Sequence, residues 1–406
     1  MKAGYLSEFF TGVAIKRLSA VEADAARSNQ HEFNGDKGLK SLFGPARQKL
    51  QGLFIYLSDN DDEPVVADGP LTWYDSRENH LTRSEHRLYF PTTSVSLCAA
   101  EGDLLVIGRR PQDSVLVLIV QGGSTIANQV LWLFNVRVDG YQGFSAREEL
   151  ETEQDRIGFA ARFILEQIGV PVETAEETFL DKILARFGAR FPRTREFSAF
   201  ARSTLPDVDS KADPDSALMA WMEREEILFR TLEKHIIADR LTQGFHNDVD
   251  GFLQFSLSVQ NRRKSRVGFA LENHMEVVLA QCGIRFERTA LSEGRSKPDF
   301  LFPGSKEYQQ LEFNPLLLTM LGVKSTCKDR WRQVLQEARR IKEKHLLTLE
   351  TSISEHQTDQ MKDEKLQLVL PKGLHGTYSD SQRKWLLDIS SFNAIVANRQ
   401  RRAAII

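Results

Sequence analysis

The stretch from residue 296 to residue 345 constrains the fold of this chain more than any other part of it. Phe300, Leu301 and Phe302 follow Pro298 and Asp299, and such a short apolar run is typical of a buried strand. A second strand is predicted to end at residues 323–326. A helix is predicted from Lys328 to about Lys344, because apolar and polar side chains alternate there at helical spacing. This order indicates α/β structure.

Three polar residues stand at the ends or on the polar side of these predicted elements. Asp299 opens the first strand, Lys324 lies at the end of the second, and Glu337 falls on the polar stripe of the helix. Two carboxylates are hard oxygen ligands that suit Mg²⁺. A lysine beside them can orient the attacking water and offset phosphate charge. The three residues therefore indicate metal-dependent phosphodiester hydrolysis.

The same three residues also allow an interpretation in which none of them is catalytic. Asp299 would cap a turn, Lys324 would be solvated, and Glu337 would pair with Arg340 for about 0.2–0.5 kcal/mol. Glu312 is also a competing candidate for the second acid, since it too could lie on a strand beside Asp299.

The stretch resembles the catalytic core of the EcoRII-type restriction endonucleases, a branch of the PD-(D/E)XK nucleases. Most members of that superfamily place the second acid two residues before the lysine, where this chain has Gly322. The EcoRII branch takes it from the following helix, thirteen residues after the lysine, where Glu337 stands. The resemblance covers roughly residues 255–375, through the strings Ser-Val-Gln-Asn-Arg-Arg-Lys-Ser-Arg (258–266), Lys-Pro-Asp-Phe-Leu-Phe-Pro (297–303) and Cys-Lys-Asp-Arg-Trp-Arg (327–332). It implies that Asp299 and Glu337 hold Mg²⁺ and that Lys324 positions the water.

A helix predicted over residues 267–281 carries Glu272 and Glu276 one turn apart. Like charges at this spacing destabilise a helix slightly, so a cation is expected nearby. The resemblance implies that Glu272 borders the metal site as a secondary ligand. His274 on the same helix is expected to be structural.

The resemblance also implies sequence readout by a polar triplet that starts four residues after the lysine. Here the triplet is Lys328, Asp329 and Arg330. Asp accepts from cytosine N4, while Arg and Lys donate to guanine. A DNA site bounded by CC and GG is therefore implied, with its central bases left open.

Residues 1–172 are predicted to be mostly β. Short apolar runs are separated by turn residues, as in a barrel or sandwich, at residues 53–57, 88–90, 104–107 and 115–120. A helix is predicted over residues 148–169. The resemblance implies an N-terminal pseudobarrel that binds a second, effector copy of the DNA site.

Two charged stretches in this half resemble the DNA-contacting arms of that pseudobarrel. The expected effector contacts are Lys16, Arg17, Arg77, Arg83, Glu85 and Arg87. Arg83, Glu85 and Arg87 could read G·C pairs. An exposed charged loop is the alternative that spacing alone leaves open.

A chain of 406 residues is long for one core, which favours two domains. We predict an effector-binding domain at 1–172, a hinge at 173–184 and a catalytic and dimerisation domain at 185–406. The last domain is predicted to be a mixed sheet flanked by helices, with a long helix over residues 218–243 and strands at 345–349 and 366–371. The cysteines show no disulfide or metal spacing and no segment has membrane-span composition, so a cytoplasmic protein is expected.

The net charge of −3 does not argue against nucleic acid, because cations cluster locally: residues 324–344 hold eight Lys or Arg and three acids. We predict a homodimeric type II restriction endonuclease that makes Mg²⁺-dependent double-strand cuts with 5′-phosphate ends, and whose N-terminal domain regulates it, through autoinhibition, until effector DNA binds. The rival predictions are a DNA-binding regulator with a silent nuclease domain and a structure-directed or RNA nuclease.

Overall fold

The computed structural model describes the chain except for residues 1, 3, 24–30, 61–62, 79, 81, 112, 139, 141–142, 173–178, 294–295, 328–329 and 406. The chain divides into two compact units, residues 1–172 with 351–354, and residues 173–350 with 355–406. The predicted domain limits stay a prediction, because compactness alone does not show that either unit folds by itself.

The first unit is built on an eight-stranded sheet in the order β2-β5-β4-β3-β7-β6-β1-β8. Its neighbours pair antiparallel, except that β3 and β7 are parallel. All four predicted strands of this half are confirmed. The bounds are β1 (Gly12–Arg17), β2 (Glu32–Gly35), β3 (Gln48–Leu57), β4 (Val65–Asp75), β5 (His86–Tyr89), β6 (Leu104–Arg109), β7 (Ser114–Val120) and β8 (Ser145–Arg147).

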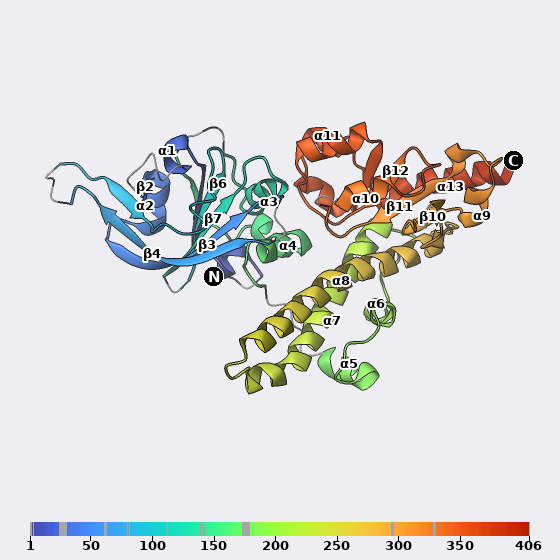
Figure 1. The fold of residues 1–406 in the computed structure, drawn as a ribbon, viewed down its shortest axis with the longest axis horizontal. Helices are drawn as coiled ribbons and strands as arrows, with labels where there is room; N and C mark the ends of the chain where they lie inside the picture. The colour runs from blue at the N-terminus through green and yellow to red at the C-terminus, as the bar shows by residue number, and fades with distance from the viewer. Residues whose placement is uncertain are drawn as a thin grey trace. The chain divides into compact units, whose positions relative to one another are not determined.

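Both faces of the central strands are buried, which explains their continuous apolar runs. Leu116 and Leu118 of β7 pack with α3 (Thr125–Leu133) and α4 (Phe159–Gln167) in one core cluster. Val115 and Val117 point to the other face, where α2 (Lys37–Phe43) joins a second cluster. The sheet curls between these helices (Figure 1).

The helix predicted over residues 148–169 is wrong in its first half. Residues 153–155 form a 3₁₀ turn, and α4 begins only at Phe159. The buried carboxylate of Asp155 accepts from Arg147 at 3.0 Å and caps that turn through Thr152. These local bonds compete with helical pairing.

The second unit contains a five-stranded mixed sheet in the order β13-β12-β11-β10-β9. β9 to β11 pair antiparallel, whereas β11, β12 and β13 are parallel. The mixed sheet flanked by helices, including the predicted strands at 345–349 and 366–371, is confirmed. The bounds are β9 (Glu287–Arg288), β10 (Phe300–Phe302), β11 (Thr319–Val323), β12 (Lys344–Leu347) and β13 (Leu366–Val369).

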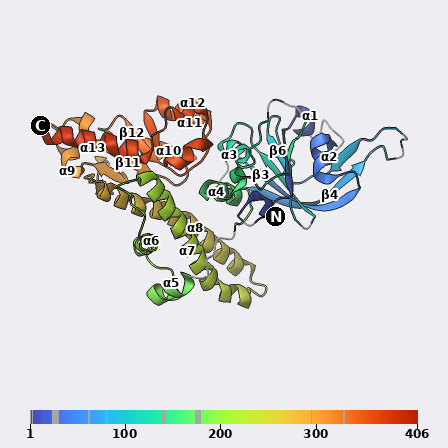
Figure 2. The same cartoon turned by 180° about the vertical axis from the view of Figure 1, so that it is seen from behind.

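Two long helices, α7 (Pro214–Gln243) and α8 (Val249–Gln281), run side by side in this unit (Figures 1 and 2). The prediction for α8 began eighteen residues too late, because the first half of α8 buries little: its first buried residue is Arg266. The remaining helices are α5 (Leu180–Phe187), α6 (Thr194–Ser203), α9 (Ser305–Gln309), α10 (Trp331–Leu335), α11 (Glu355–Asp363), α12 (Asp380–Arg383) and α13 (Ile389–Ile405).

Two further predictions differ from the structure. The predicted hinge at 173–184 lies partly outside the described residues, and its last part, 180–184, is the start of α5. The helix predicted from Lys328 to Lys344 is reduced to α10, so Glu337 follows the helix instead of lying on it. In the described part of the chain, no helix is both long enough and apolar enough to span a membrane.

Candidate active site

Asp299 and Lys324 meet where β10 and β11 lie side by side. Asp299 directly precedes β10, and Lys324 directly follows β11. The Oδ2 atom of Asp299 accepts from the Val323 amide at 2.6 Å and from the Lys324 Nζ at 3.1 Å. The lysine side chain is only 23% exposed. Asp299 is thus held against the neighbouring strand, and Lys324 is an ion-pair partner rather than a solvated cation.

Glu337 completes this group of charges. Burial, and next the charge of Asp299, raise the pKa of Glu337 to about 7, while Lys324 and Lys344 oppose the rise. Its Oε2 atom is buried and has no hydrogen-bond partner among the described residues. A buried carboxylate oxygen without a partner is costly, and such an oxygen is available to bind a cation.

The expected alternative pairing of Glu337 with Arg340 does not form. The Arg340 guanidinium instead donates to the main-chain oxygens of Tyr308, Gln310 and Phe313. Ala338 has a left-handed φ of 45°, and Lys344 Nζ donates to Leu335 O at 3.0 Å. The helix therefore stops at Leu335, and the turn that follows presents Glu337 to Asp299.

Gly322 explains why the second acid lies outside β11. A Cβ atom at this position would come within 2.9 Å of Val334 Cγ2 in α10. The close packing of α10 against the strand therefore leaves no room for a carboxylate at residue 322. Glu312, the competing acid, is exposed in a turn after α9 and not on a strand, which removes the reason for choosing it.

Glu272 lies at the border of the site, where Arg288 binds it. The Arg288 guanidinium donates to Glu272 at 2.7 Å and to Glu276 at 2.6 Å. The expectation of a cation near this acid pair is confirmed. Burial raises the pKa of Glu272; Arg288 opposes that rise, and Asp299 adds to it. His274 is fully buried, 2.9 Å from Glu225, which fits a structural role.

The donor set fits Mg²⁺ through two carboxylates. Among the described residues, no group of three or more His, Cys, Asp or Glu side chains forms a preformed metal cage. Mg²⁺ keeps several waters and is commonly bound by one or two carboxylates, so Asp299 and the unpartnered oxygen of Glu337 are compatible with it.

Sequence inspection missed Arg288 and Lys344 as parts of this site. Arg288 could have been found from the acid pair at helical spacing. Lys344 is buried and close enough to Glu337 for their charges to interact, and burial lowers its pKa. No sequence pattern indicated it, because it begins a strand.

Of the predicted readout triplet, only Arg330 can be placed. Lys328 and Asp329 lie outside the described residues. Arg330 is exposed at the start of α10, and its amide donates to Cys327 O at 2.7 Å. The side chain is therefore accessible to a ligand.

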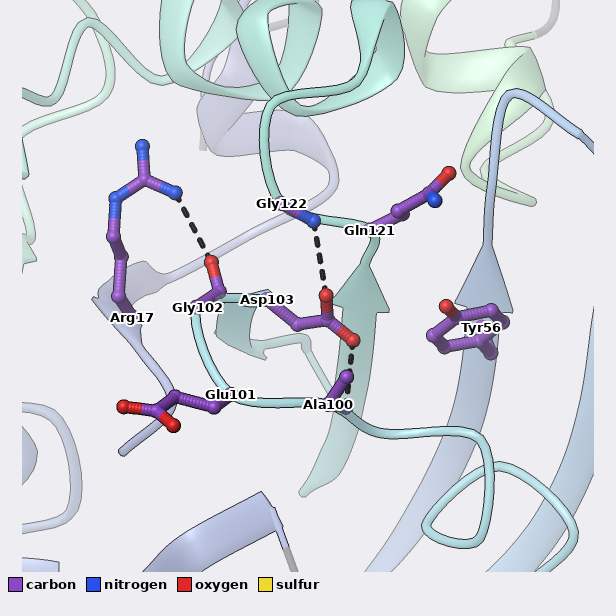
Figure 3. A pocket seen from close by; sticks show the side chains of 8 residues that line it. All are labelled: Arg17, Tyr56, Ala100, Glu101, Gly102, Asp103, Gln121 and Gly122. Atoms are coloured by element: carbon purple, nitrogen blue, oxygen red, sulfur yellow. Dashed lines mark hydrogen bonds between the residues drawn. The ribbon is translucent and has the colours of Figure 1, made fainter. Parts of the chain in front are cut away.

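The predicted effector contacts in the first unit fall into two places. Lys16 is buried and its ammonium pairs with Glu22 at 2.7 Å, whereas Arg17 donates to Gly102 O at 3.1 Å. Arg17 lines a polar pocket of about 560 Å³ together with Tyr56, Ala100, Glu101, Gly102, Asp103, Gln121 and Gly122 (Figure 3).

Three of the other effector candidates, Arg77, Glu85 and Arg87, form a charge network near the start of β5. Glu85 pairs with Arg77 at 2.6 Å and with Arg87 at 2.7 Å, and Arg87 also pairs with Glu32 at 3.0 Å. Arg83 is exposed. Their contact with DNA stays a prediction, and the network shows that Glu85 and Arg87 would have to exchange partners to read bases.

A family model matches much of the second half of the chain. Residues 229–393 match the family model described as EcoRII C terminal. The chain is 40% identical over 206 residues to the type II restriction enzyme EcoRII of Escherichia coli, which is 50% of this chain and 50% of that enzyme. The chain thus matches about half the length of this curated relative.

Solved structures of two restriction endonucleases are similar at low identity. Metal-depleted Ecl18kI in complex with uncleaved, modified DNA has a TM-score of 0.45 at 17% identity, covering 56% of this chain and 86% of that one. The PspGI–substrate DNA complex has a TM-score of 0.45 at 16% identity, covering 52% and 94%.

Proposed function

We propose that the chain, whose residues 229–393 match the EcoRII C-terminal family model, is a type II restriction endonuclease that cuts both strands of DNA at a short site. The observation that carries the proposal is the buried, unpartnered Oε2 of Glu337, in a carboxyl whose pKa the nearby Asp299 helps to raise. The matched region contains both acids and Lys324.

Asp299 and Glu337 would hold Mg²⁺, which lowers the pKa of bound water and offsets charge on the scissile phosphate. Asp299 also keeps the Lys324 ammonium in place through the 3.1 Å contact. From there Lys324 orients the attacking water and stabilises the charge that develops on phosphate oxygens. Arg288 holds Glu272 at the edge of the site. Attack of water on phosphorus, with cleavage of the P–O3′ bond and protonation of the leaving 3′ oxygen, leaves 5′-phosphate and 3′-hydroxyl ends.

The proposed substrate is duplex DNA with a site bounded by CC and GG. Arg330 supports it, because an exposed guanidinium at a helix start can donate to guanine in the major groove. Two active sites would cut the two strands in one binding event, and a homodimer formed by the second unit would supply them.

A regulatory role for the first unit belongs to the same proposal. An effector DNA bound by Arg17, Arg77 and Arg83 would stimulate cleavage, and the unliganded unit would inhibit it. The support is a second set of exposed or half-exposed arginines in the first unit, with Arg17 at the end of β1 and Arg77 and Arg83 between β4 and β5.

Digestion of a plasmid of known sequence with Mg²⁺, followed by mapping of the ends, tests the proposal. We expect discrete double-strand cuts at CC…GG sites with 5′-phosphate ends. Sequence-specific binding without cutting would instead identify the DNA-binding regulator. Cutting that follows branched DNA or RNA, and not sequence, would identify a structure-directed nuclease.

A further inference from the structure

The turn that carries Glu337 has little local bonding of its own. α10 ends at Leu335, and the Glu337 amide donates to Val334 O at 3.2 Å, the upper end of the normal range. Ala338 follows with a left-handed φ of 45°, a conformation that is unfavourable for a residue with a Cβ atom. Contacts from another segment are therefore needed to fix the direction of the Glu337 carboxylate.

Tyr308 supplies such a contact to the main chain that follows the turn. Its phenol oxygen accepts from the Arg340 amide at 3.2 Å, and its hydroxyl donates to the Glu293 carboxylate. The other oxygen of that carboxylate accepts from the Arg339 amide at 3.2 Å. Burial, and next the bond to Glu293, raise the pKa of Tyr308, so the hydroxyl keeps the proton that it donates. Two consecutive amides are thus bound by side chains from outside the turn.

Arg340 returns the contact to the segment of Tyr308. Its guanidinium donates to Tyr308 O, to Gln310 O at 2.9 Å and to Phe313 O at 3.0 Å. An arginine that binds phosphate points its fork of donors at the ligand. Here the fork is directed at three main-chain oxygens, which fits a role in holding the turn rather than in contacting DNA.

The segment that holds the Glu337 turn is also connected to Asp299. Asp299 directly precedes β10, which ends at Phe302, and Tyr308 lies in α9, which begins at Ser305. The charge of Asp299 acts on the Glu337 carboxyl, so the two acids are close enough to interact. The β10–α9 segment therefore carries one acid and holds the turn of the other.

We propose that Tyr308 and Arg340 are positioning residues that hold the Glu337 carboxylate toward Asp299 before a divalent cation binds. Because the turn is fixed in advance, the cation does not have to order it, and its affinity is higher. Loss of the Tyr308 hydroxyl removes the acceptor of the Arg340 amide and a donor to Glu293, so the turn loosens and the affinity falls. The inference rests on the proposed nuclease function and names the residues that prepare its metal site.

The test measures Mn²⁺ binding by the full-length protein on a duplex with the mapped site. A methylene group replaces each scissile 3′ oxygen, so that the duplex is bound and not cut, and the electron paramagnetic resonance signal reports free Mn²⁺. Y308F keeps the buried ring, and Y378F is the matched control, because Tyr378 is 4% exposed and its hydroxyl donates to Glu350 O at 2.6 Å. We expect the dissociation constant to rise about tenfold in Y308F and to stay within about twofold in Y378F.

The same substitution in the E337Q background shows whether Tyr308 acts through Glu337. With the positioned carboxylate gone, Y308F should change the dissociation constant less than about twofold. An equal rise in both backgrounds would mean that Tyr308 only supports the fold, and would overturn the inference. An unchanged constant in Y308F, with a wild type that cuts the mapped site, would overturn the inference alone. A wild type that neither binds Mn²⁺ nor cuts would overturn the proposed function as well.

Should Y308F not fold, hydrogen exchange on the wild type without metal decides. The amides of Arg339 and Arg340 should already be protected, and Mn²⁺ should increase their protection less than about threefold. A larger increase would show that the cation, and not the contact with Tyr308, orders the turn, and would overturn the inference.

Discussion

At the scale of single residues, the carboxyl of Glu337 makes the stability of the folded protein depend on pH. Its pKa is raised from the ordinary 4.5 to about 7, so the metal-free folded protein binds this proton more tightly than the unfolded chain does. The stability from the protonated form is complete below about pH 4.5 and is lost as pH rises through about 7.

We therefore predict that metal-free E337Q loses less stability than the wild type between about pH 5 and about pH 8. Urea unfolding in the presence of a chelator measures this. E312Q is the matched control, because Glu312 is exposed and should leave the wild-type pH slope unchanged. Parallel slopes for the wild type and E337Q would contradict the assigned pKa.

Arg330 is the second residue with a specific expectation. R330A should lose about 1–3 kcal/mol of discrimination against an exchanged G·C pair, because a bidentate contact to guanine is lost. Binding of matched and exchanged duplexes, without metal, measures the loss. R332A, which removes a neighbouring exposed arginine that lies over Trp331, is the control and should weaken both duplexes alike. A uniform loss in R330A would show that Arg330 contacts phosphate only.

At the scale of secondary-structure elements, one buried carboxylate fastens α7 to α13. Asp215, in the first turn of α7, accepts from the amides of Lys372, Ile389 and Ser390 and from Ser390 Oγ. Three of these donors would otherwise be unpaired at the start of α13 or just after β13.

We predict that D215A lowers the free energy of unfolding by about 3 kcal/mol, since several bonds to a charged acceptor are lost and the Ile389 amide stays buried. Chemical denaturation measures it. D380A removes an exposed ion pair with Arg383 and should cost less than about 1 kcal/mol. Equal losses in the two variants would show that Asp215 contributes no more than a surface charge.

The strands of both sheets were largely predictable from the sequence, whereas the helix that should have carried Glu337 was not. Runs such as Val115–Val120 predict strands because both sheet faces bury them. The polar stripe after Trp331 predicted a long helix. Instead, Arg340 donates to Phe313 O, which is distant in the sequence, and Lys344 donates to Leu335 O at the last residue of α10. Such tertiary bonds leave no local pattern.

The candidate site was likewise predictable in part: its residues could be chosen from the sequence, but the packing around them could not. Asp299, Lys324 and Glu337 follow from residue types and from resemblance, and the structure joins Asp299 to Lys324 directly. The exclusion of an acid at Gly322 depends on the packing of Val334, which only the folded chain shows. The bond from the Cys327 amide to the Glu350 carboxylate was hidden for a similar reason, because the two residues lie twenty-three positions apart.

At the scale of the whole molecule, α5 determines at which residue a stable fragment of the second unit can begin. Ile183 is fully buried in a cluster with α6 and α7. A fragment of residues 185–406 lacks this side chain, so we predict that it is about 2–5 kcal/mol less stable than a fragment of residues 179–406. Urea unfolding of both fragments measures the difference, and equal stability would contradict the role of Ile183.

The longer fragment also tests the regulatory part of the proposal. If the first unit inhibits the second, residues 179–406 should cut a single-site plasmid at least as fast as the full chain. A folded but inactive fragment would show that the first unit contributes to catalysis or to DNA binding, and the proposed autoinhibition would fail.

The central claim is that Asp299, Lys324 and Glu337 form one hydrolytic site with Glu337 as its second acid. The most direct measurement is the initial rate of plasmid cleavage with Mg²⁺ by the wild type, E337Q and E312Q, each first shown to bind the same duplex without metal. We predict that E337Q falls at least about a hundredfold while E312Q keeps the wild-type rate, because a metal ligand is lost without loss of the phosphate contacts that set affinity. Cleavage by E337Q at the wild-type rate, with E312Q inactive, would contradict the account.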